Sequence, residues 1–356
     1  MDPRALPTPG PGEPPGFDPR AIASYYSYPG QFDGSGISIA LVSLFGGYRR
    51  SDLETYFAGA ILPMPTVEDV SVLGARNDPS GDPDDNIELT QDLEILGSCA
   101  PGARLVVYFA KNTEQGIIHG LGQAISDSGP DSPIIYLNWC IPESELNGMI
   151  AQGIDRLAIT AVLLGKTICA PSGAAAPGEK AFFPGTDPHV LSCGETWAAP
   201  RGDGLAECPA PGMGDAAAGS RLYPPPEWQA AVSGRSGRRA RGRLVPDVTC
   251  FTGGELGYRC YVNGTWLGVA RPAVAACMWA GLLARVHQAL GRPWGMVSDF
   301  YTVLGPAGAL APPGGAPGSA HPAWDARAGW GTPHGERLLA VLQNPPPTGR
   351  GGPPAR

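Results

Sequence analysis

The sequence lacks several features that directly identify a metal-binding, secreted or membrane protein. Its eight cysteines include no Cys-x-x-Cys spacing, which argues against a zinc site of paired thiolates and against a redox dithiol. The first residues hold no apolar run of the kind found in a secretory signal peptide, and no stretch of 18 apolar residues predicts a membrane helix. We therefore expect a soluble, cytoplasmic protein that does not bind a membrane.

A basic surface is also missing. The formal net charge is −8, whereas proteins that bind nucleic acids present an excess of Lys and Arg, so we expect no nucleic-acid partner. One basic run occurs in a Gly/Ser/Arg segment and is expected to be a solvated loop, with an acidic partner as the alternative. It consists of Arg235, Arg238, Arg239, Arg241 and Arg243.

Most of the cysteines lie in apolar strings, where a free cysteine behaves as a small core residue. Cys169 in Thr167-Ile168-Cys169-Ala170 is an example. Cys250 and Cys260 flank a predicted turn and would pair only in an oxidising compartment, so in the cytosol we expect them to be reduced.

No internal linker divides the 356 residues, which favours one large domain. We expect a single domain over residues 17–345. Residues 1–16 are rich in Pro and Gly and are predicted to be disordered, as is a tail over residues 346–356.

Continuous apolar runs alternate with helical patterns, which predicts an α/β fold with a mostly parallel central sheet flanked by helices on both faces. The predicted strands cover residues 37–43, 104–109, 133–137, 166–169 and 189–192. The predicted helices cover residues 51–57, 88–96, 114–126, 143–164 and 273–290. Residues 258–266, with Asn263-Gly264 at their centre, predict a hairpin with a type I′ turn.

Glu88 and Asp92 are the first candidates for chemistry. They lie four positions apart in Ile87-Glu88-Leu89-Thr90-Gln91-Asp92, so a helix here places both carboxylates on one face. Like charges at this spacing cost an isolated helix roughly 0.2–0.5 kcal/mol. The pair is therefore either idle on a solvated face or used as an acid/base pair.

The flanking sequence resembles the sedolisins, the serine-carboxyl peptidases of family S53, which have a subtilisin-like fold. Six segments carry this resemblance in order along the chain: residues 32–40, 87–110, 183–194, 223–229, 242–248 and 283–295, including the strings Phe183-Pro184-Gly185-Thr186 and Tyr223-Pro224-Pro225-Pro226-Glu227-Trp228. The resemblance implies a three-layer subtilisin-like fold. It also implies that Glu88 stands at the position of the family's general base and Asp92 at the position of the aspartate that orients it.

Two further catalytic positions of the family are changed in this chain. The family's nucleophilic serine lies in a Gly-Thr-Ser-Ala-x-x-Pro motif, and the corresponding segment here is Ala270-Arg271-Pro272-Ala273. Ala273 takes the place of the serine, and a methyl group cannot attack a carbonyl. Ala174 takes the place of the oxyanion-stabilising aspartate. Only a gapped match would make Ser172 or Cys277 the nucleophile.

The resemblance also implies a substrate cleft and a calcium loop. The cleft would be lined by Trp139, Ser172, Gly173 and Arg271. Of the calcium loop only His321-Pro322-Ala323-Trp324-Asp325 is retained, and Asp325 alone supplies too few of the six to eight oxygen ligands that calcium takes. We therefore expect no calcium, no other metal and no cofactor.

Three functions are compatible with these residues. The first is a pseudopeptidase that binds a peptide or a partner's tail in the cleft without cleaving it. The second is a repurposed enzyme in which Glu88 and Asp92 perform acid/base chemistry on a small, non-peptide ligand. The third is a residual endopeptidase that activates water through Glu88. The sequence leaves all three open.

Overall fold

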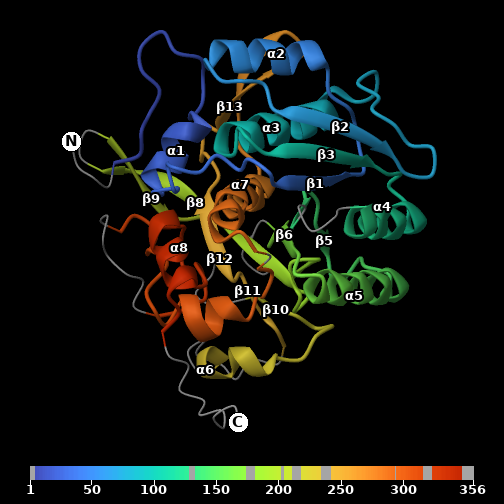
Figure 1. Cartoon of the computed structure of the whole chain (residues 1–356), viewed down its shortest axis with the longest axis vertical. Coiled ribbons are helices and arrows are strands. Elements are labelled where there is room, and N and C mark those ends of the chain that lie inside the picture. The colour runs from blue at the N-terminus through green and yellow to red at the C-terminus, as the bar shows by residue number, and fades with distance from the viewer. Residues whose placement is uncertain are drawn as a thin grey trace.

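The computed structural model describes residues 5–127, 133–173, 181–201, 204–210, 218–233, 242–292, 294–315 and 323–346. An eight-stranded sheet forms its centre (Figure 1). Seven strands follow the order β12-β8-β6-β4-β1-β3-β2, and each neighbouring pair along this path is parallel. They are β12 (Val248–Phe251), β8 (Val190–Arg201), β6 (Thr167–Pro171), β4 (Ile134–Leu137), β1 (Ser38–Ser43), β3 (Arg104–Phe109) and β2 (Thr66–Ser71). The eighth strand, β9 (Gly204–Pro209), pairs antiparallel with β8.

Helices cover both faces of the sheet, which gives three layers (Figure 1). One face carries α3 (Pro83–Cys99) and α7 (Ala273–Leu290), with α1 (Pro19–Tyr25) and α8 (Gly335–Gln343) beside them. The other face carries α4 (Glu114–Asp127) and α5 (Gly148–Leu163). Residues of β1 alternate between the two cores, because Ile39 faces the first core and Ala40 the second. The expected α/β class with a mostly parallel sheet is confirmed.

The central helix α7 is the most apolar element of the fold. By length and hydropathy it meets the criteria for a membrane-spanning helix, although 78% of it is buried inside the protein. It packs on β4, β6, β8 and β12 and against α3. Gly291 ends it in the left-handed conformation, at φ 61°. Its composition is thus that of a core helix.

The predicted elements agree with the structure except at a few boundaries. Strand β3 and helix α7 have the expected bounds. Helix α5 begins at Gly148, five residues later than expected, because Asn147 caps it and the Glu143 carboxylate instead accepts hydrogen bonds from Ser220 Oγ at 2.6 Å and Arg221 N at 2.8 Å. Strand β2 was not predicted, since it is a mostly exposed edge strand without apolar alternation.

Shorter elements complete the chain. They are α2 (Arg50–Gly59), β5 (Ile141–Pro142), β7 (Phe182–Phe183), β10 (Ala218–Gly219), a 3-10 turn (Glu227–Gln229), α6 (Ala230–Ser233), β11 (Leu244–Val245), β13 (Tyr258–Val262), β14 (Thr265–Val269) and a π-helical turn (Phe300–Leu304). The β13–β14 hairpin is the expected one: Asn263 and Gly264 both have positive φ, 53° and 79°, as a type I′ turn requires.

The amino-terminal segment differs from the expected disorder. Leu6 is buried at 4% exposure, and its backbone N–H donates to Leu205 O at 2.8 Å. Gly16 packs so closely on the backbone of Tyr258 and Arg259 that a Cβ at this position would lie 2.6 Å from Arg259 N. Apolar burial and backbone pairing therefore order residues 5–16 despite their composition. Residues 1–4 and 347–356 lie outside the described part of the chain.

Candidate functional site

Helix α3 positions the two candidate carboxylates. Asp82 caps its amino terminus by accepting the N–H of Asp84, and Pro83 occupies the first turn, where its missing N–H costs nothing. The helix then continues without interruption to Cys99. Glu88 and Asp92 are therefore one helical turn apart on a continuous helix, as the sequence predicts.

Asp92 is fully buried, and three side chains contact its carboxylate. Tyr136 Oη donates to Oδ1 at 2.9 Å, Asn138 Nδ2 donates to Oδ2 at 3.2 Å, and Arg271 Nη2 lies 2.6 Å from Oδ1. Tyr136 belongs to β4 and Asn138 follows it, so both reach Asp92 from the carboxyl end of that strand. Burial raises the pKa of Asp92 above its usual range, and the positive charge of Arg271 opposes that shift.

Arg271 links the two carboxylates of the pair. Its Nη1 lies 3.6 Å from Glu88 Oε2, its Nη2 also donates to Glu88 O at 2.8 Å, and its Nε donates to Gln91 Oε1 at 3.0 Å. Burial is the largest influence and lowers the pKa of the guanidinium, but the attraction of Asp92, Tyr136 and Glu88 and the hydrogen bond to Asp92 together outweigh it, so this pKa is raised. The predicted cleft residue Arg271 is thus committed to contacts with α3.

Glu88 is the more accessible member of the pair. Its side chain is 45% exposed, whereas that of Asp92 is inaccessible. Burial raises the pKa of Glu88 above its usual range, Arg271 lowers it, and the neighbouring charge of Asp92 adds to the rise. Glu88 is consequently the carboxylate of this pair that a bound molecule reaches.

Ala273 lies beside this cluster at the first residue of α7. It is 5% exposed, and its carbonyl oxygen accepts a 3.3 Å hydrogen bond from Tyr136 Oη, the same hydroxyl that contacts Asp92. Pro272 precedes it with helical torsions, φ −56° and ψ −33°. The structure therefore brings Glu88, Asp92 and Ala273 together, with Arg271 among them.

The other predicted cleft residues, Trp139, Ser172 and Gly173, lie within the described part of the chain. Trp139 is 8% exposed, and its indole nitrogen has no hydrogen-bond partner among the described residues. Ser172 Oγ makes a long 3.5 Å hydrogen bond to Gly173 O. Gly173 has φ +84°, and a Cβ there would lie 2.2 Å from the Phe182 ring. Ala174 lies outside the described residues.

Cys277, which a gapped match would make the nucleophile, is poorly placed for that role. It is fully buried, and its thiol donates to the backbone oxygen of Asp92 at 3.5 Å. Burial raises the pKa of this thiol well above its usual range, so the nucleophilic thiolate is disfavoured.

Asp325 closes a turn. Its Oδ1 accepts the backbone N–H groups of Arg327 at 2.7 Å and Ala328 at 2.8 Å. These contacts form a side-chain-capped turn. Asp325 does not belong to a potential metal-binding group within the described part of the chain.

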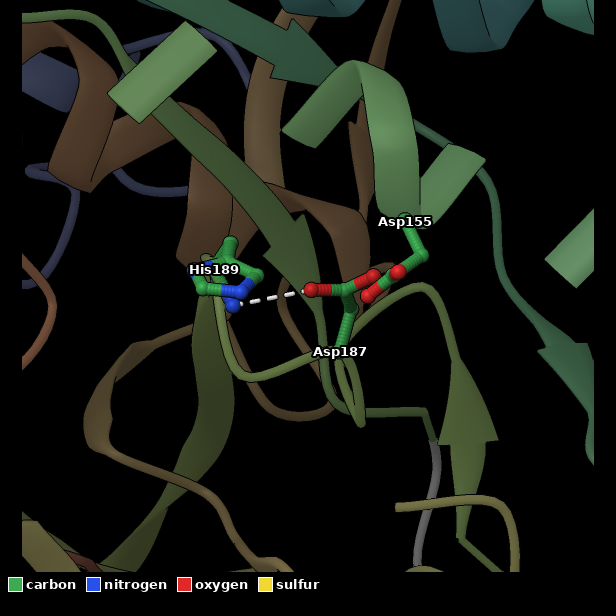
Figure 2. Close-up of side chains that lie close together, drawn as sticks. All are labelled: Asp155, Asp187 and His189. Atoms are coloured by element: carbon green, nitrogen blue, oxygen red, sulfur yellow. Dashed lines mark hydrogen bonds between the residues drawn. The ribbon is translucent and has the colours of Figure 1, made fainter. Parts of the chain in front are cut away.

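Within the described part of the chain, one group of side chains has ligand atoms close enough together to hold a metal ion. It consists of Asp155 on α5 with Asp187 and His189 from the loop before β8, and Figure 2 shows the two carboxylates facing each other. One ligand atom from each residue lies within 4.8 Å of the others. The sequence analysis did not find this group, because 32 residues separate its two aspartates.

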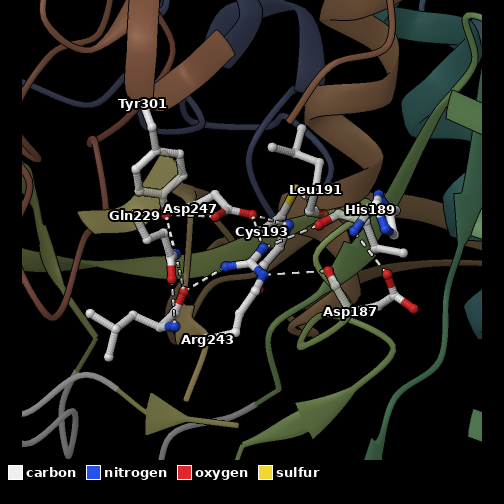
Figure 3. A network of polar contacts seen from close by, with 11 residues as sticks. Asp187, His189, Leu191, Cys193, Gln229, Arg243, Asp247 and Tyr301 are labelled. Atoms are coloured by element: carbon white, nitrogen blue, oxygen red, sulfur yellow. Dashed lines mark hydrogen bonds and ion pairs between the residues drawn. The ribbon is translucent and has the colours of Figure 1, made fainter. Parts of the chain in front are cut away.

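The basic run was expected to be solvated, but one of its residues, Arg243, lies in the interior. Its side chain is fully buried and pairs with Asp247 at 2.6 Å, as Figure 3 shows, and Nη1 donates to Leu244 O at 2.5 Å. The guanidinium also lies 5.2 Å from the ring centroid of Trp228. A buried arginine is tolerated here because a carboxylate and backbone carbonyls take its donors. Arg235, Arg238, Arg239 and Arg241 lie outside the described residues.

The site also contains residues that the sequence analysis missed: Gln91, Tyr136 and Asn138 all hold the carboxylate–arginine cluster. A usable signal was the position of Tyr136 and Asn138 at the carboxyl end of a predicted buried strand, where α/β sheets place functional side chains.

Known proteins resemble this chain in sequence and in fold. Kumamolisin from a Bacillus species is 33% identical over 355 residues, which cover 92% of this chain and 64% of that protein. Tripeptidyl-peptidase sed5 from Aspergillus fumigatus is 26% identical over 317 residues, which cover 76% of this chain and 53% of that protein. The chain thus spans between about half and two thirds of the length of these relatives. No protein-family model matches it.

Two solved structures share the fold. A Pseudomonas sedolisin, a serine-carboxyl proteinase in complex with two molecules of pseudo-iodotyrostatin, has a TM-score of 0.74 at 21% identity, with 94% of this chain and 100% of that chain covered. Sphericase has a TM-score of 0.57 at 15% identity, with 90% and 98% covered.

Proposed function

Because the chain belongs to the sedolisin family of serine-carboxyl peptidases, family S53, with its subtilisin-like α/β fold, we propose that it is a catalytically impaired member. In this proposal it is a pseudopeptidase that binds an extended peptide or a protein tail beside Glu88 without cleaving it.

The observation that carries the proposal is the contact of Arg271 with both carboxylates, at 2.6 Å from Asp92 and 3.6 Å from Glu88. A general base must take a proton from a nucleophile within hydrogen-bond reach. Here the residue beside the pair is Ala273, whose methyl group carries no such proton. The guanidinium is therefore the partner of the two carboxylates where a serine hydroxyl would be needed.

The neighbouring side chains give no substitute for the serine. Cys277 is buried under α3, and its raised pKa keeps the thiol protonated. Ser172 Oγ contacts only the carbonyl oxygen of Gly173 in the described part of the chain, so it has no base there. Removing a nucleophile costs about as much rate as removing the whole catalytic unit.

Binding is the function that this arrangement retains. Glu88 is 45% exposed and offers a carboxylate that accepts hydrogen bonds from a peptide N–H or a basic side chain. Two carboxylates and one guanidinium leave one formal negative charge when both acids are ionised. The proposal therefore favours a peptide with an N–H donor or a cation near Glu88 over an acidic one.

A direct test is peptide capture by the full chain. The protein is immobilised, incubated near pH 6 with a random peptide library, washed and analysed by mass spectrometry. Intact peptides enriched in basic residues should be retained, and Glu88→Gln should lower their affinity about tenfold, or about 1.4 kcal/mol. The matched control is Glu54→Gln, which removes an exposed carboxylate on α2 that pairs with Arg50. Peptides cut in a Glu88-dependent way would refute the pseudopeptidase proposal.

The exposure and raised pKa of Glu88 favour one alternative, a repurposed enzyme in which Glu88 transfers a proton on a non-peptide substrate. In that case the library would yield no bound peptide. A small-molecule screen by thermal shift would then give ligands whose binding is lost in Glu88→Gln and kept in Glu54→Gln.

A further inference from the structure

We propose that Asp155, Asp187 and His189 form a binding site for a divalent transition-metal ion, with Zn²⁺ as the best-fitting ion. This site is separate from the Glu88 cluster and independent of the proposed function. Asp187 and His189 precede the first residue of β8, whereas Tyr136 and Asn138 lie at the end of the parallel strand β4. Because the strands are parallel, the two clusters lie at opposite ends of the strands of the central sheet.

The three side chains converge from two elements. Asp155 reaches the group from α5, and Asp187 and His189 come from the loop that leads into β8 (Figure 2). One ligand atom of each lies within 4.8 Å of the other two. Ligands at the usual zinc distances of about 2.0–2.2 Å lie roughly 3.4 Å from one another in a tetrahedron, so a contraction of at most about 1.4 Å brings the group to that spacing. Asp155 and His189 are half-buried, whereas Asp187 is fully buried.

The charges of the group call for a cation. Asp187 is fully buried beside Asp155, and Asp155 has no hydrogen-bond partner among the described residues. Arg243 lies near Asp187, but its Nη2 donates to the Asp247 carboxylate at 2.6 Å. Its Nε donates to the backbone oxygen of Asp187, at 3.4 Å, and not to the Asp187 carboxylate. Two facing carboxylates in a poorly solvated place repel each other unless a proton or a metal ion lies between them.

The imidazole decides which ion fits. Calcium and magnesium take oxygen ligands, whereas an imidazole with two carboxylates is a zinc-type set that leaves a fourth position for water. A neutral imidazole is the form in which histidine binds metals. The hydrogen bond drawn in Figure 2 is donated by the backbone N–H of His189, not by its ring, to Asp187 Oδ1 at 2.8 Å.

An unpartnered hydroxyl lies next to the group in the chain. Thr186 directly precedes Asp187 and is fully buried, yet its Oγ1 has no hydrogen-bond partner within the described part of the chain. Buried polar atoms are nearly always satisfied by protein or water, so this hydroxyl calls for a partner.

Supporting contacts hold the ligands in place, as metal sites require. Asp187 Oδ1 accepts the backbone N–H of His189 at 2.8 Å, and Oδ2 accepts Tyr223 Oη at 3.3 Å. Arg243 Nη2 donates to Val190 O at 3.3 Å, which fixes the backbone just after His189. These contacts hold the backbone of the loop and the Asp187 carboxylate in place beside α5.

The experiment measures zinc binding to the full chain after dialysis against a chelator. Isothermal titration with ZnCl₂ should give one site per chain. We expect His189→Gln and Asp155→Asn each to weaken it at least about 100-fold, and Tyr223→Phe to weaken it about tenfold. Circular dichroism checks that each variant is folded, and the half-buried positions of Asp155 and His189 make them suitable for substitution.

Two matched controls separate this site from adventitious binding. His119→Gln removes an exposed histidine on α4, and Cys208→Ser removes a partly exposed thiol; neither should change the titration. Cobalt substitution adds a spectroscopic readout, since thiolate ligands give charge-transfer bands that carboxylate and imidazole ligands do not. The proposal is overturned if no zinc binds, if His189→Gln and Asp155→Asn leave binding unchanged, or if Co²⁺ shows thiolate ligation.

Discussion

Arg271 Nη2 lies 2.6 Å from Asp92 Oδ1, although the two residues are 179 positions apart in the chain. Asp92 is inaccessible to solvent and the Arg271 side chain is 11% exposed, so this is a buried ion pair. Tyr136 and Asn138 complete the contacts of the carboxylate. Such a pair costs desolvation energy to form, and its loss leaves an uncompensated charge. The arginine therefore fixes the positions of the two carboxylates, and it is itself the charged partner of both.

We predict that the purified protein does not cleave casein or peptide libraries from about pH 3 to pH 8. Ala273 carries no nucleophilic atom, and Arg271 holds both carboxylates. Peptide products are measured by mass spectrometry after long incubation. Cleavage that Glu88→Gln abolishes would reveal a water-activating peptidase, whereas cleavage that this change leaves intact identifies a contaminant.

We predict that Arg271→Met destabilises the protein by about 3–5 kcal/mol, because it leaves the buried Asp92 carboxylate without its counter-charge. Adding Asp92→Asn should recover at least half of that loss, since the neutral amide needs no cation. Urea unfolding at pH 7 measures both variants. Arg50→Met, at an exposed pair on α2, serves as the control and should change stability by less than about 0.5 kcal/mol. Equal stabilities of Arg271→Met and the wild type would contradict the prediction.

We predict a fall in stability as the pH rises from about 4.5 to about 7. Burial raises the pKa of Glu207 from 4.5 to about 7, and its carboxylate accepts a 2.5 Å hydrogen bond from Tyr26 Oη. Across this window the folded chain keeps a proton that the unfolded chain has lost, so deprotonation favours unfolding.

Urea unfolding of the wild type and Glu207→Gln across this pH range tests the assignment. The variant should lose roughly 1–3 kcal/mol less than the wild type, because its amide does not titrate. A wild-type curve that runs parallel to that of the variant would exclude Glu207 as a source of the pH dependence.

We predict that restoring serine at position 273 and aspartate at position 174 does not by itself recover strong peptidase activity. Arg271 would still pair with Asp92, and Pro272 fixes φ and removes a backbone donor in the turn. Catalysis falls steeply when reacting groups are misplaced by about 1 Å. A quadruple variant that adds Arg271→Gly and Pro272→Thr is compared with the double variant on one peptide at acidic pH. Equal activity of the two would show that the loop sequence is neutral.

Local patterns in the sequence were enough to predict much of the architecture. Apolar runs such as residues 104–109 predict buried parallel strands, and Asn263-Gly264 predicts the type I′ turn that the positive φ angles confirm. Edge strand β2 escaped prediction because neither of its faces is buried enough to leave an apolar pattern.

The sequence by itself determined the spacing of Glu88 and Asp92 on one helix, because that spacing depends only on residue identity and helical periodicity. It also predicts, from the resemblance to the sedolisins, that Ala273 stands at the position of the family's serine. The tertiary structure decided the rest of both clusters. It paired Arg271 with Asp92, buried Arg243 against Asp247, and brought Asp155 to Asp187 and His189. The physical reason is that a charge enters the interior only where partners from distant elements converge on it, and that convergence is set by the packing of helices on the sheet.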